Sequence, residues 1–259
     1  MTDKIRLAGT IRPLNYNLFF DIDLKRFRFS GKEAVDLEIG KPAAKIVLHS
    51  SGLKIRSASV LSGGKTIKAK IGEDSGLEQI TLIVGERIAG DARLFLEFEG
   101  ELTDSMVGLY RSRYTVKNSD RYIATTQFEA TYARRAFPCF DEPAYKATFE
   151  VAMRVNKDMH AISNMPAKEE RKEGKKKTVV FHKTPKMSTY LLYLGAGEFD
   201  FLEDKAGRIL VRLVTAPGKK PQARLAMDLT KKFLDYFQKY SGIPYPLPKL
   251  DMIAIPDFA

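Results

Sequence analysis

The sequence predicts a mainly β protein, and three observations support this fold class. Apolar and polar residues alternate in many short runs, and Tyr16, Leu18 and Phe20 would share one face of such a strand. Glycine pairs such as Gly63-Gly64 separate neighbouring runs and indicate hairpins. Only one segment has apolar residues at helical spacing. Short strands at this spacing are typical of an antiparallel β-sandwich or open barrel.

Predicted strands follow one another along most of the chain. The first two are joined by a turn around Lys25, and the lysine-rich segment 168–177 is expected to form a solvated hairpin tip. Segment 189–195 is more continuously apolar and is expected to be an interior strand. The predicted strands cover residues 16–22, 34–39, 45–49, 59–61, 66–69, 79–84, 93–98, 122–129, 148–155, 178–182, 189–195, 209–214 and 250–255.

The one predicted helix lies between Pro221 and Gly242. Proline suits the first turn of a helix, and glycine suits the position just past its end. The apolar stripe of this helix consists of Ala226, Leu229, Phe233, Phe237 and Tyr240.

Composition limits the class of protein. The chain has 43 basic and 32 acidic residues and a formal charge of +11, which could indicate nucleic acid or an acidic partner. The basic residues are spread and mixed with acids, which favours a lysine-coated surface and no nucleic-acid partner.

The single cysteine, Cys139, excludes an intrachain disulfide and is expected to be buried packing rather than a nucleophile. The first residues lack the apolar region of a signal peptide, and no apolar run approaches the ~20 residues of a membrane helix. These observations predict a cytoplasmic protein that does not bind membranes.

A strand that runs into an ordered loop occupies residues 122–143. Thr125, Gln127 and Glu129 are predicted to share one strand face, which places an amide and a carboxylate side by side. Two prolines then end the strand. The adjacent carboxylates Asp141 and Glu142 would point apart in extended chain, so we expect salt bridges to the arginines at 134 and 135 rather than an acid–base pair.

This stretch and several others resemble the aminopeptidase N family of zinc metallopeptidases, which includes the archaeal tricorn-interacting aminopeptidases and puromycin-sensitive aminopeptidase. The most specific block is Gln-Phe-Glu-Ala at 127–130 with Phe-Pro-Cys-Phe-Asp-Glu-Pro at 137–143. The remaining blocks occur in the family's order at 12–16, 29–31, 100–112, 133–135, 146–149, 161–166 and 185–192.

The resemblance implies two domains. Residues 1–203 would form the family's saddle-shaped β-sandwich N-terminal domain, and residues 204–259 the incomplete start of a thermolysin-like catalytic domain. The sequence stops before the family's Gly-Ala-Met-Glu-Asn and His-Glu-x-x-His motifs. His49, His160 and His182 lack the spacing of a zinc helix, so no metal ligand and no catalytic residue is expected here. Zinc would belong to the complete family enzyme.

By the same resemblance, Glu129 would bind the α-amine of a peptide substrate, and Gln127 would flank the pocket for its first side chain. The bond between Glu129 and Ala130 is a candidate for the cis peptide that often follows this glutamate in the family.

Three hypotheses about the chain stay open. It could be one part of a split enzyme whose second chain carries the zinc-binding catalytic domain, because an apolar helix face and an unpaired strand edge need a cover. It could be a truncated fragment that is inactive alone. It could also be a stand-alone β-sandwich module that captures peptide N-termini through Gln127 and Glu129.

Overall fold

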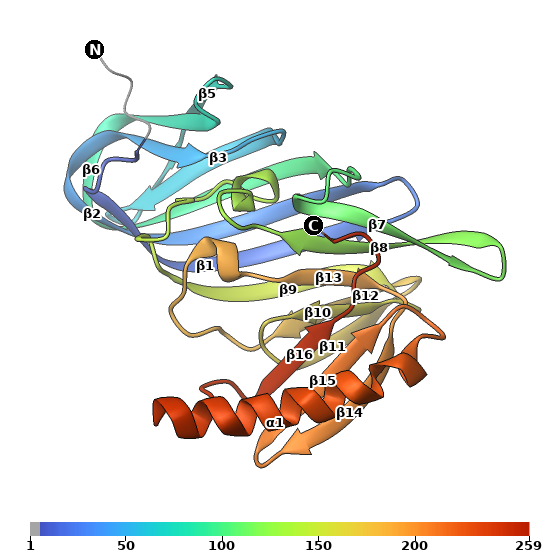
Figure 1. Cartoon of the computed structure of the whole chain (residues 1–259). Helices are drawn as coiled ribbons and strands as arrows, with labels where there is room; N and C mark the ends of the chain where they lie inside the picture. The colour runs from blue at the N-terminus through green and yellow to red at the C-terminus, as the bar shows by residue number, and fades with distance from the viewer. Residues whose placement is uncertain (1–5, 259) are drawn as a thin grey trace.

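The protein, a computed structural model that describes residues 6–258, consists mainly of β-strands in three sheets (Figure 1). The mainly β prediction is therefore confirmed. The strands are β1 (Ile11–Asp23), β2 (Arg28–His49), β3 (Lys54–Ser62), β4 (Lys65–Lys68), β5 (Lys70–Asp74), β6 (Gln79–Glu101), β7 (Gly108–Val116), β8 (Ser119–Gln127), β9 (Thr148–Asn156), β10 (His160–Ser163), β11 (Ala167–Glu173), β12 (Lys176–Phe181), β13 (Leu194–Gly197), β14 (Asp200–Ala206), β15 (Ile209–Thr215) and β16 (Lys249–Ile253). The helical segments are the 3-10 turns η1 (Ala133–Arg135), η2 (Thr189–Leu191) and η3 (Lys220–Ala223), and the helix α1 (Arg224–Ser241).

The largest sheet has nine strands in the order β11-β12-β9-β1-β2-β6-β3-β4, with β5 also paired to β6. Its pairs are antiparallel except for β1 and β9, which run parallel. The hairpin predicted at Gly63-Gly64 is confirmed, because both glycines have positive φ between β3 and β4. The lysine-rich segment is a hairpin, as predicted, but its tip is only Gly174 and Lys175: residues 168–173 belong to β11, which is exposed along its length, and Lys176 begins β12.

Two strands of this sheet are longer than the sequence indicated. The segments predicted separately at 34–39 and 45–49 are both part of β2, and those at 79–84 and 93–98 are both part of β6. The pairing of β2 with β6 shifts register between Ile39 and Lys45, and Gly85 and Gly90 have positive φ. Bulges and glycines therefore bend these strands where the sequence pattern suggested that they end.

The second sheet has the order β10-β13-β8-β7 and lies beside the large sheet in Figure 1. The strand predicted at 189–195 is wrong in its first half, because Thr189–Leu191 forms the turn η2 and only Leu194–Gly197 is a strand. The side chains that precede the strand explain this. Ser188 donates to the carbonyl of Pro143, and Thr189 donates to Asp141, so both are held by the neighbouring loop instead of a partner strand.

One buried aromatic side chain fixes the loop that follows β8. Phe137 makes edge-on contacts with Tyr16, Phe20 and Phe128, at ring-centroid distances of 5.9, 6.4 and 6.2 Å. All four side chains are buried in the main core. The loop is thus anchored to the large sheet by apolar contacts rather than lying free on the surface.

The third sheet, β14-β15-β16, carries the helix α1 on one face (Figure 1). The predicted helix is confirmed, with Pro221 in the preceding turn and Gly242 in the left-handed conformation at its end. Its buried residues are Met227, Thr230 and Leu234, whereas the stripe from Leu229 to Tyr240 is exposed. The predicted boundary at 203 lies inside β14, and the division into two domains stays a prediction. No helix within residues 6–258 is long and apolar enough to cross a membrane.

Candidate functional site

The end of β8 is held by polar side chains from the neighbouring chain segments. The hydroxyl groups of Thr125 and Tyr193 lie 3.1 Å apart, and the hydroxyl of Thr126 accepts a hydrogen bond from the backbone N–H of Leu194 at 3.0 Å. Burial raises the pKa of Tyr193, so this phenol stays neutral at physiological pH. These contacts fix the direction of β8 up to its last residue, Gln127.

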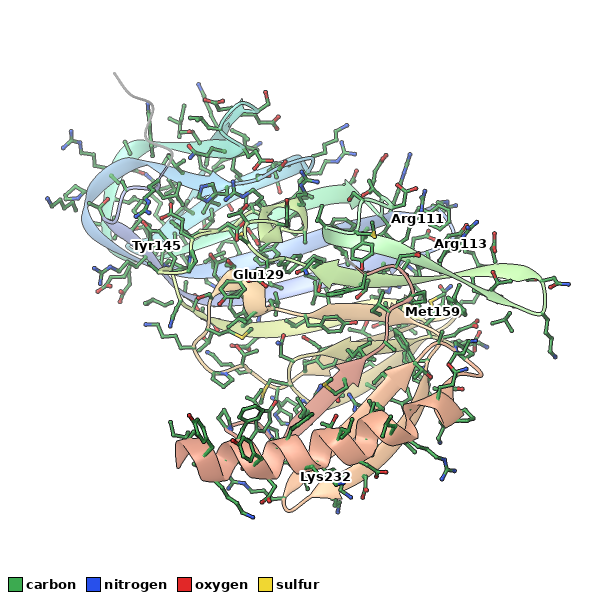
Figure 2. All side chains as sticks on the ribbon, viewed as in Figure 1. Arg111, Arg113, Glu129, Tyr145, Met159 and Lys232 are labelled. Atoms are coloured by element: carbon green, nitrogen blue, oxygen red, sulfur yellow. The ribbon has the colours of Figure 1, made fainter. Side chains whose placement is uncertain are left out.

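Glu129 lies beyond the strand, and this corrects the prediction of one strand through 129. β8 ends at Gln127, and the backbone N–H of Tyr132 donates to the carbonyl of Phe128 over 2.9 Å, which closes a turn. The amide oxygen of Gln127 accepts a hydrogen bond from the backbone N–H of Glu129 at 3.0 Å. The side chain of Gln127 therefore contacts the backbone of Glu129, and the side chain of Glu129, labelled in Figure 2, is exposed. The predicted cis bond between Glu129 and Ala130 is present.

A glycine allows the turn η1 to approach β7 closely. Gly108 pairs with Gln127 across β7 and β8 and has φ +74°. A Cβ atom at Gly108 would lie 2.7 Å from the Cβ of Arg135 in η1. Only glycine fits this backbone conformation and this spacing without strain.

A cavity of about 400 Å³ opens beside Gln127. It is bounded by the end of β8, by η2 and by the edge strand β16, and polar groups on its wall include Asn164, Tyr193 and Asp251. Glu129 is not among its lining residues. The cavity could accept an apolar or polar side chain next to Gln127, while Glu129 stands outside it.

Lys249 and Asp251 line this cavity and belong to a group of charges that was not predicted from the sequence. The guanidinium of Arg212 donates to both carboxylate oxygens of Asp251, at 2.7 and 2.6 Å, and the ammonium of Lys249 contacts the same carboxylate. Lys249 also donates to the carbonyl of Ser163 in β10 over 2.7 Å. Burial lowers the pKa of Lys249. The alternation of Lys249 and Asp251 in a strand was the only sequence signal, and Arg212 lies too far away in sequence to be linked to them.

The salt bridge predicted for Asp141 is confirmed. Arg134 Nε lies 3.0 Å from Asp141 Oδ2, and both side chains are almost fully buried. Cys139 is a buried free cysteine, as predicted, and its backbone pairs with His49. Burial raises the pKa of the Cys139 thiol, which does not suit a nucleophile. Among residues 6–258, no three His, Cys, Asp or Glu side chains gather in a way that could hold a metal ion.

Comparison with known proteins decides the family. The family model of the Peptidase M1 N-terminal domain matches residues 12–191, which is more than half of the chain. The chain belongs to the peptidase M1 family. The resemblance to aminopeptidases of the aminopeptidase N family is thereby confirmed, and the Gln127–Glu129 segment lies inside the matched region.

Several curated M1 relatives match nearly all of this chain. "Probable aminopeptidase 2" of Sulfurisphaera tokodaii is 42% identical over 245 residues, covering 94% of this chain and 29% of its own length. "Puromycin-sensitive aminopeptidase" of Caenorhabditis elegans is 39% identical, covering 98% of this chain and 28% of its own. "Aminopeptidase M1" of Arabidopsis thaliana is 42% identical, with 98% and 30% covered. The chain thus spans less than a third of the length of these relatives.

Proposed function

We propose that this chain supplies the part of a zinc aminopeptidase that binds the α-amine of a peptide substrate. Glu129 would accept hydrogen bonds from the ammonium group, and Gln127 would flank the first side chain of the peptide. The observation that carries this proposal is the pairing of Gln127 and Glu129 at the end of β8, beside a cavity of about 400 Å³. Membership in the M1 family and the names of the relatives support it.

The chemistry of the two side chains fits this role. A free N-terminus carries a positive charge, and a carboxylate binds it through charge-assisted hydrogen bonds, which are stronger than neutral ones. Glu129 is exposed in this chain, so its attraction for an amine is screened by water. A second wall that excludes water would strengthen the contact, and we expect that wall to come from polypeptide corresponding to the rest of the relatives' length.

Zinc would supply the hydrolytic chemistry in the complete enzyme. The described residues of this chain contain no group of side chains suited to hold the ion, so no catalytic step is assigned to them. The role proposed here is binding and orientation of the substrate. Because the proposed role is binding and not hydrolysis, aminopeptidase activity would depend on a complementary polypeptide. The chain alone is expected to be inactive.

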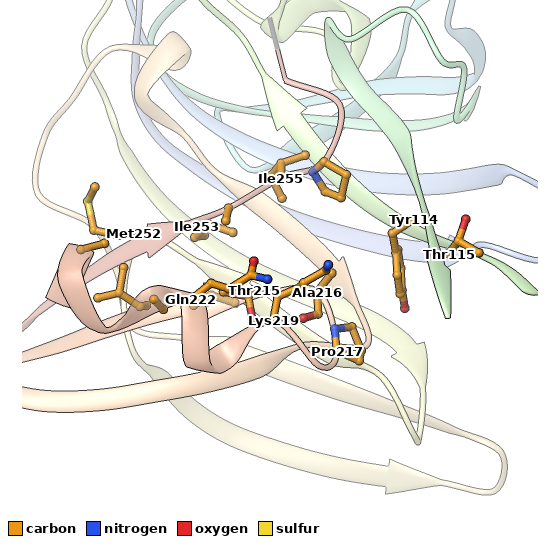
Figure 3. Close-up of a pocket in the computed structure, with 16 residues that line it drawn as sticks. Tyr114, Thr115, Thr215, Ala216, Pro217, Lys219, Gln222, Met252, Ile253 and Ile255 are labelled. Carbon is orange, nitrogen blue, oxygen red and sulfur yellow. Dashed lines mark hydrogen bonds between the residues drawn. The ribbon is translucent and has the colours of Figure 1, made fainter. Parts of the chain in front are cut away.

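The exposed face of α1 supports a large protein partner over a stand-alone module. A monomer would present the exposed large apolar side chains of this helix to water: Leu225, Leu229, Phe233, Tyr236, Phe237 and Tyr240. An apolar cavity of about 630 Å³ lies between β7 and the third sheet and reaches α1 at Ala226; Tyr114, Ala216 and Ile255 are among the residues that line it (Figure 3). We propose that polypeptide carrying the zinc site covers this surface.

A cytoplasmic location also stays a proposal. The one cysteine is buried and unpaired, which agrees with a reducing compartment. Fractionation of the source cells, with detection of this chain, tests it.

Binding of peptides to the isolated chain tests the amine-binding role. We expect an alanine tripeptide with a free amine to bind more tightly than its N-acetylated form in an NMR titration. Glu129→Gln should remove most of that preference, and because Glu129 is exposed the loss should lie below the about 1.5–3 kcal/mol of a hydrogen bond to a charged group in a dry site. Glu73→Gln, the same change on the exposed strand β5, is the control and should have no effect. Equal binding of the two peptides, both by the unaltered chain and by its assembly with the polypeptide that carries the zinc site, would refute the role.

The proposed partner is tested with a polypeptide that corresponds to the part of the S. tokodaii relative that this chain does not cover. We expect it to co-elute with this chain in size-exclusion chromatography and to bring zinc. The double variant Phe233→Lys, Phe237→Lys should abolish co-elution, whereas Lys232→Ala on the same helix should not. If the double variant still co-elutes with the polypeptide, the polypeptide does not bind through this face of α1.

A further inference from the structure

The loop that carries Glu129 is attached to the protein at both ends. It leaves β8 at Gln127 and returns to β2 where the backbones of His49 and Cys139 exchange hydrogen bonds of 2.8 and 3.0 Å. Between these points lies the turn η1, which follows Glu129 closely in the chain. Hydrogen bonds from Tyr132 to Phe128 and from Arg135 to Tyr132 make this part of the chain a continuous series of turns, so a shift of η1 moves Glu129.

A buried carboxylate holds η1 in place. Asp141 Oδ2 accepts hydrogen bonds from Arg134 Nε at 3.0 Å and from the backbone N–H of Arg134 at 3.3 Å. Its other oxygen, Oδ1, accepts from the hydroxyl of Thr189 at 2.8 Å. The side chain of Asp141 is 1% exposed and that of Arg134 is 11% exposed. Little water can replace these contacts, so the geometry of the pair depends on its protein partners.

Arg134 also connects η1 to the large sheet. Its Nη1 group donates to Glu78 Oε2 at 3.1 Å, and its backbone carbonyl accepts from the N–H of Ser51 at 3.0 Å. Ser51 in turn donates through its hydroxyl to Glu78 at 2.8 Å. Arg134 is therefore bonded on one side to Asp141 in its own loop and on the other side to the segments that flank β2 and β6.

We propose that Asp141, through its buried ion pair with Arg134, is the positioning residue that fixes Glu129 for its contact with a substrate amine. Asp141 does not touch the substrate. This inference rests on the amine-binding role proposed for Glu129, and it adds that the role requires an acidic residue twelve positions later in the chain. Its consequence is that loss of the pair should impair recognition of the amine more than recognition of the rest of the peptide.

The test compares the affinity for the free alanine tripeptide with that for its N-acetylated form, in the full chain. A purely structural role would change both affinities together and leave their ratio unchanged. Asp141→Asn keeps the size of the side chain but removes the charge opposite Arg134, and it should lower the ratio towards one by about the same factor as Glu129→Gln does. Asp235→Asn, in the exposed pair with Lys239, is the matched control and should leave the ratio unchanged.

If circular dichroism shows that Asp141→Asn does not fold, Thr189→Val serves as a milder variant. It removes only the hydroxyl that donates to Asp141 Oδ1, and it should lower the ratio several-fold. A folded Asp141→Asn or Thr189→Val protein with an unchanged ratio would overturn the inference. Glu129→Gln separates the two proposals: if it lowers the ratio and Asp141→Asn does not, only the positioning role fails. If neither the unaltered chain nor its assembly with the polypeptide that carries the zinc site shows a preference, the amine-binding role itself fails.

Discussion

The amide oxygen of Gln127 accepts a hydrogen bond from the backbone N–H of Glu129, with 3.0 Å between the two heavy atoms. This bond joins Glu129, two residues beyond the strand end, to the last residue of β8. Gln127 therefore has two roles in this account, since it lines the cavity and also orients the turn that carries the carboxylate.

Replacing Gln127 separates these roles. Gln127→Ala removes the acceptor, and we expect the free-amine peptide to bind more weakly by about 0.5–1.5 kcal/mol, the net value of one hydrogen bond. Gln127→Glu keeps an acceptor oxygen and adds negative charge, so it should bind the same peptide at least as well as the unaltered chain. Titrations of both variants check this, and unchanged binding by Gln127→Ala would show that the bond has no role in recognition.

The close approach of Gly108 to Arg135 predicts a specific loss of stability. Gly108→Ala places a methyl group 2.7 Å from the Arg135 Cβ and also strains a positive φ, whereas Gly52→Ala strains a similar φ with nothing within 4 Å. Backbone strain should lower the free energy of unfolding of each variant by about 1–2 kcal/mol. Overpacking should lower that of Gly108→Ala by about 1–3 kcal/mol more. Urea denaturation measures the stability of both variants. Equal losses of stability would mean that η1 does not pack tightly against β7 at Gly108.

Glu33 predicts a stabilising substitution. Its carboxyl group is buried, neither oxygen has a hydrogen-bond partner among the described residues, and burial raises its pKa well above the usual 4.5. The folded state therefore keeps a proton that the unfolded chain releases above pH 4.5, so this group lowers stability increasingly as the pH rises from there. Glu33→Met should increase the free energy of unfolding by about 1–3 kcal/mol at pH 7.5 and by less at pH 4.5.

The exposed Glu97 on the neighbouring strand β6 is the control for this substitution. Glu97→Met should change the free energy of unfolding by less than about 0.5 kcal/mol at either pH. A Glu33→Met protein that is less stable than the unaltered chain at pH 7.5 would show that the carboxyl group makes a favourable contact in the core.

The burial of His49 predicts that its effect on stability depends on pH in the opposite sense to that of Glu33. Burial, followed by the charge of Arg134, lowers its pKa below 6.5, and its Nδ1 accepts a hydrogen bond from the backbone N–H of Asp141 at 3.2 Å. The neutral ring is thus favoured in the folded state. Its contribution to stability is complete above pH 6.5 and is lost as the pH falls through the lowered pKa. Between pH 6.5 and 5.5 the unaltered chain should lose more stability than His49→Gln, and parallel losses would contradict this.

Local sequence signals predicted the features that depend on near neighbours. The helix between Pro221 and Gly242, the glycine hairpin after β3 and the ion pair of Arg134 with Asp141 all involve residues close together in the chain. Their chemistry restricts the backbone or supplies the partner directly, so the pattern was sufficient.

Features that depend on distant segments could not be predicted in this way. The alternation of Gln127 and Glu129 predicted a longer strand, but β8 ends at Gln127 because Phe128 packs against Phe137, which in turn packs on Tyr16 of β1. The predicted strand at 189–195 begins as a turn because Asp141 takes the hydroxyl of Thr189. The spacing of the α1 stripe identified a helix, but which side of it is buried depends on how the helix packs on β14 and β15.

The central claim, that Glu129 binds the substrate amine, is tested most directly in the reconstituted enzyme. This chain is combined with a zinc-binding polypeptide that corresponds to the remaining length of a relative, and kcat/KM is measured for an amino-acid amide. Glu129→Gln should lower kcat/KM by about ten- to 160-fold, because the contact is worth about 1.5–3 kcal/mol, while zinc content and assembly stay unchanged. An unchanged kcat/KM for Glu129→Gln in the assembled, zinc-loaded enzyme would contradict the account.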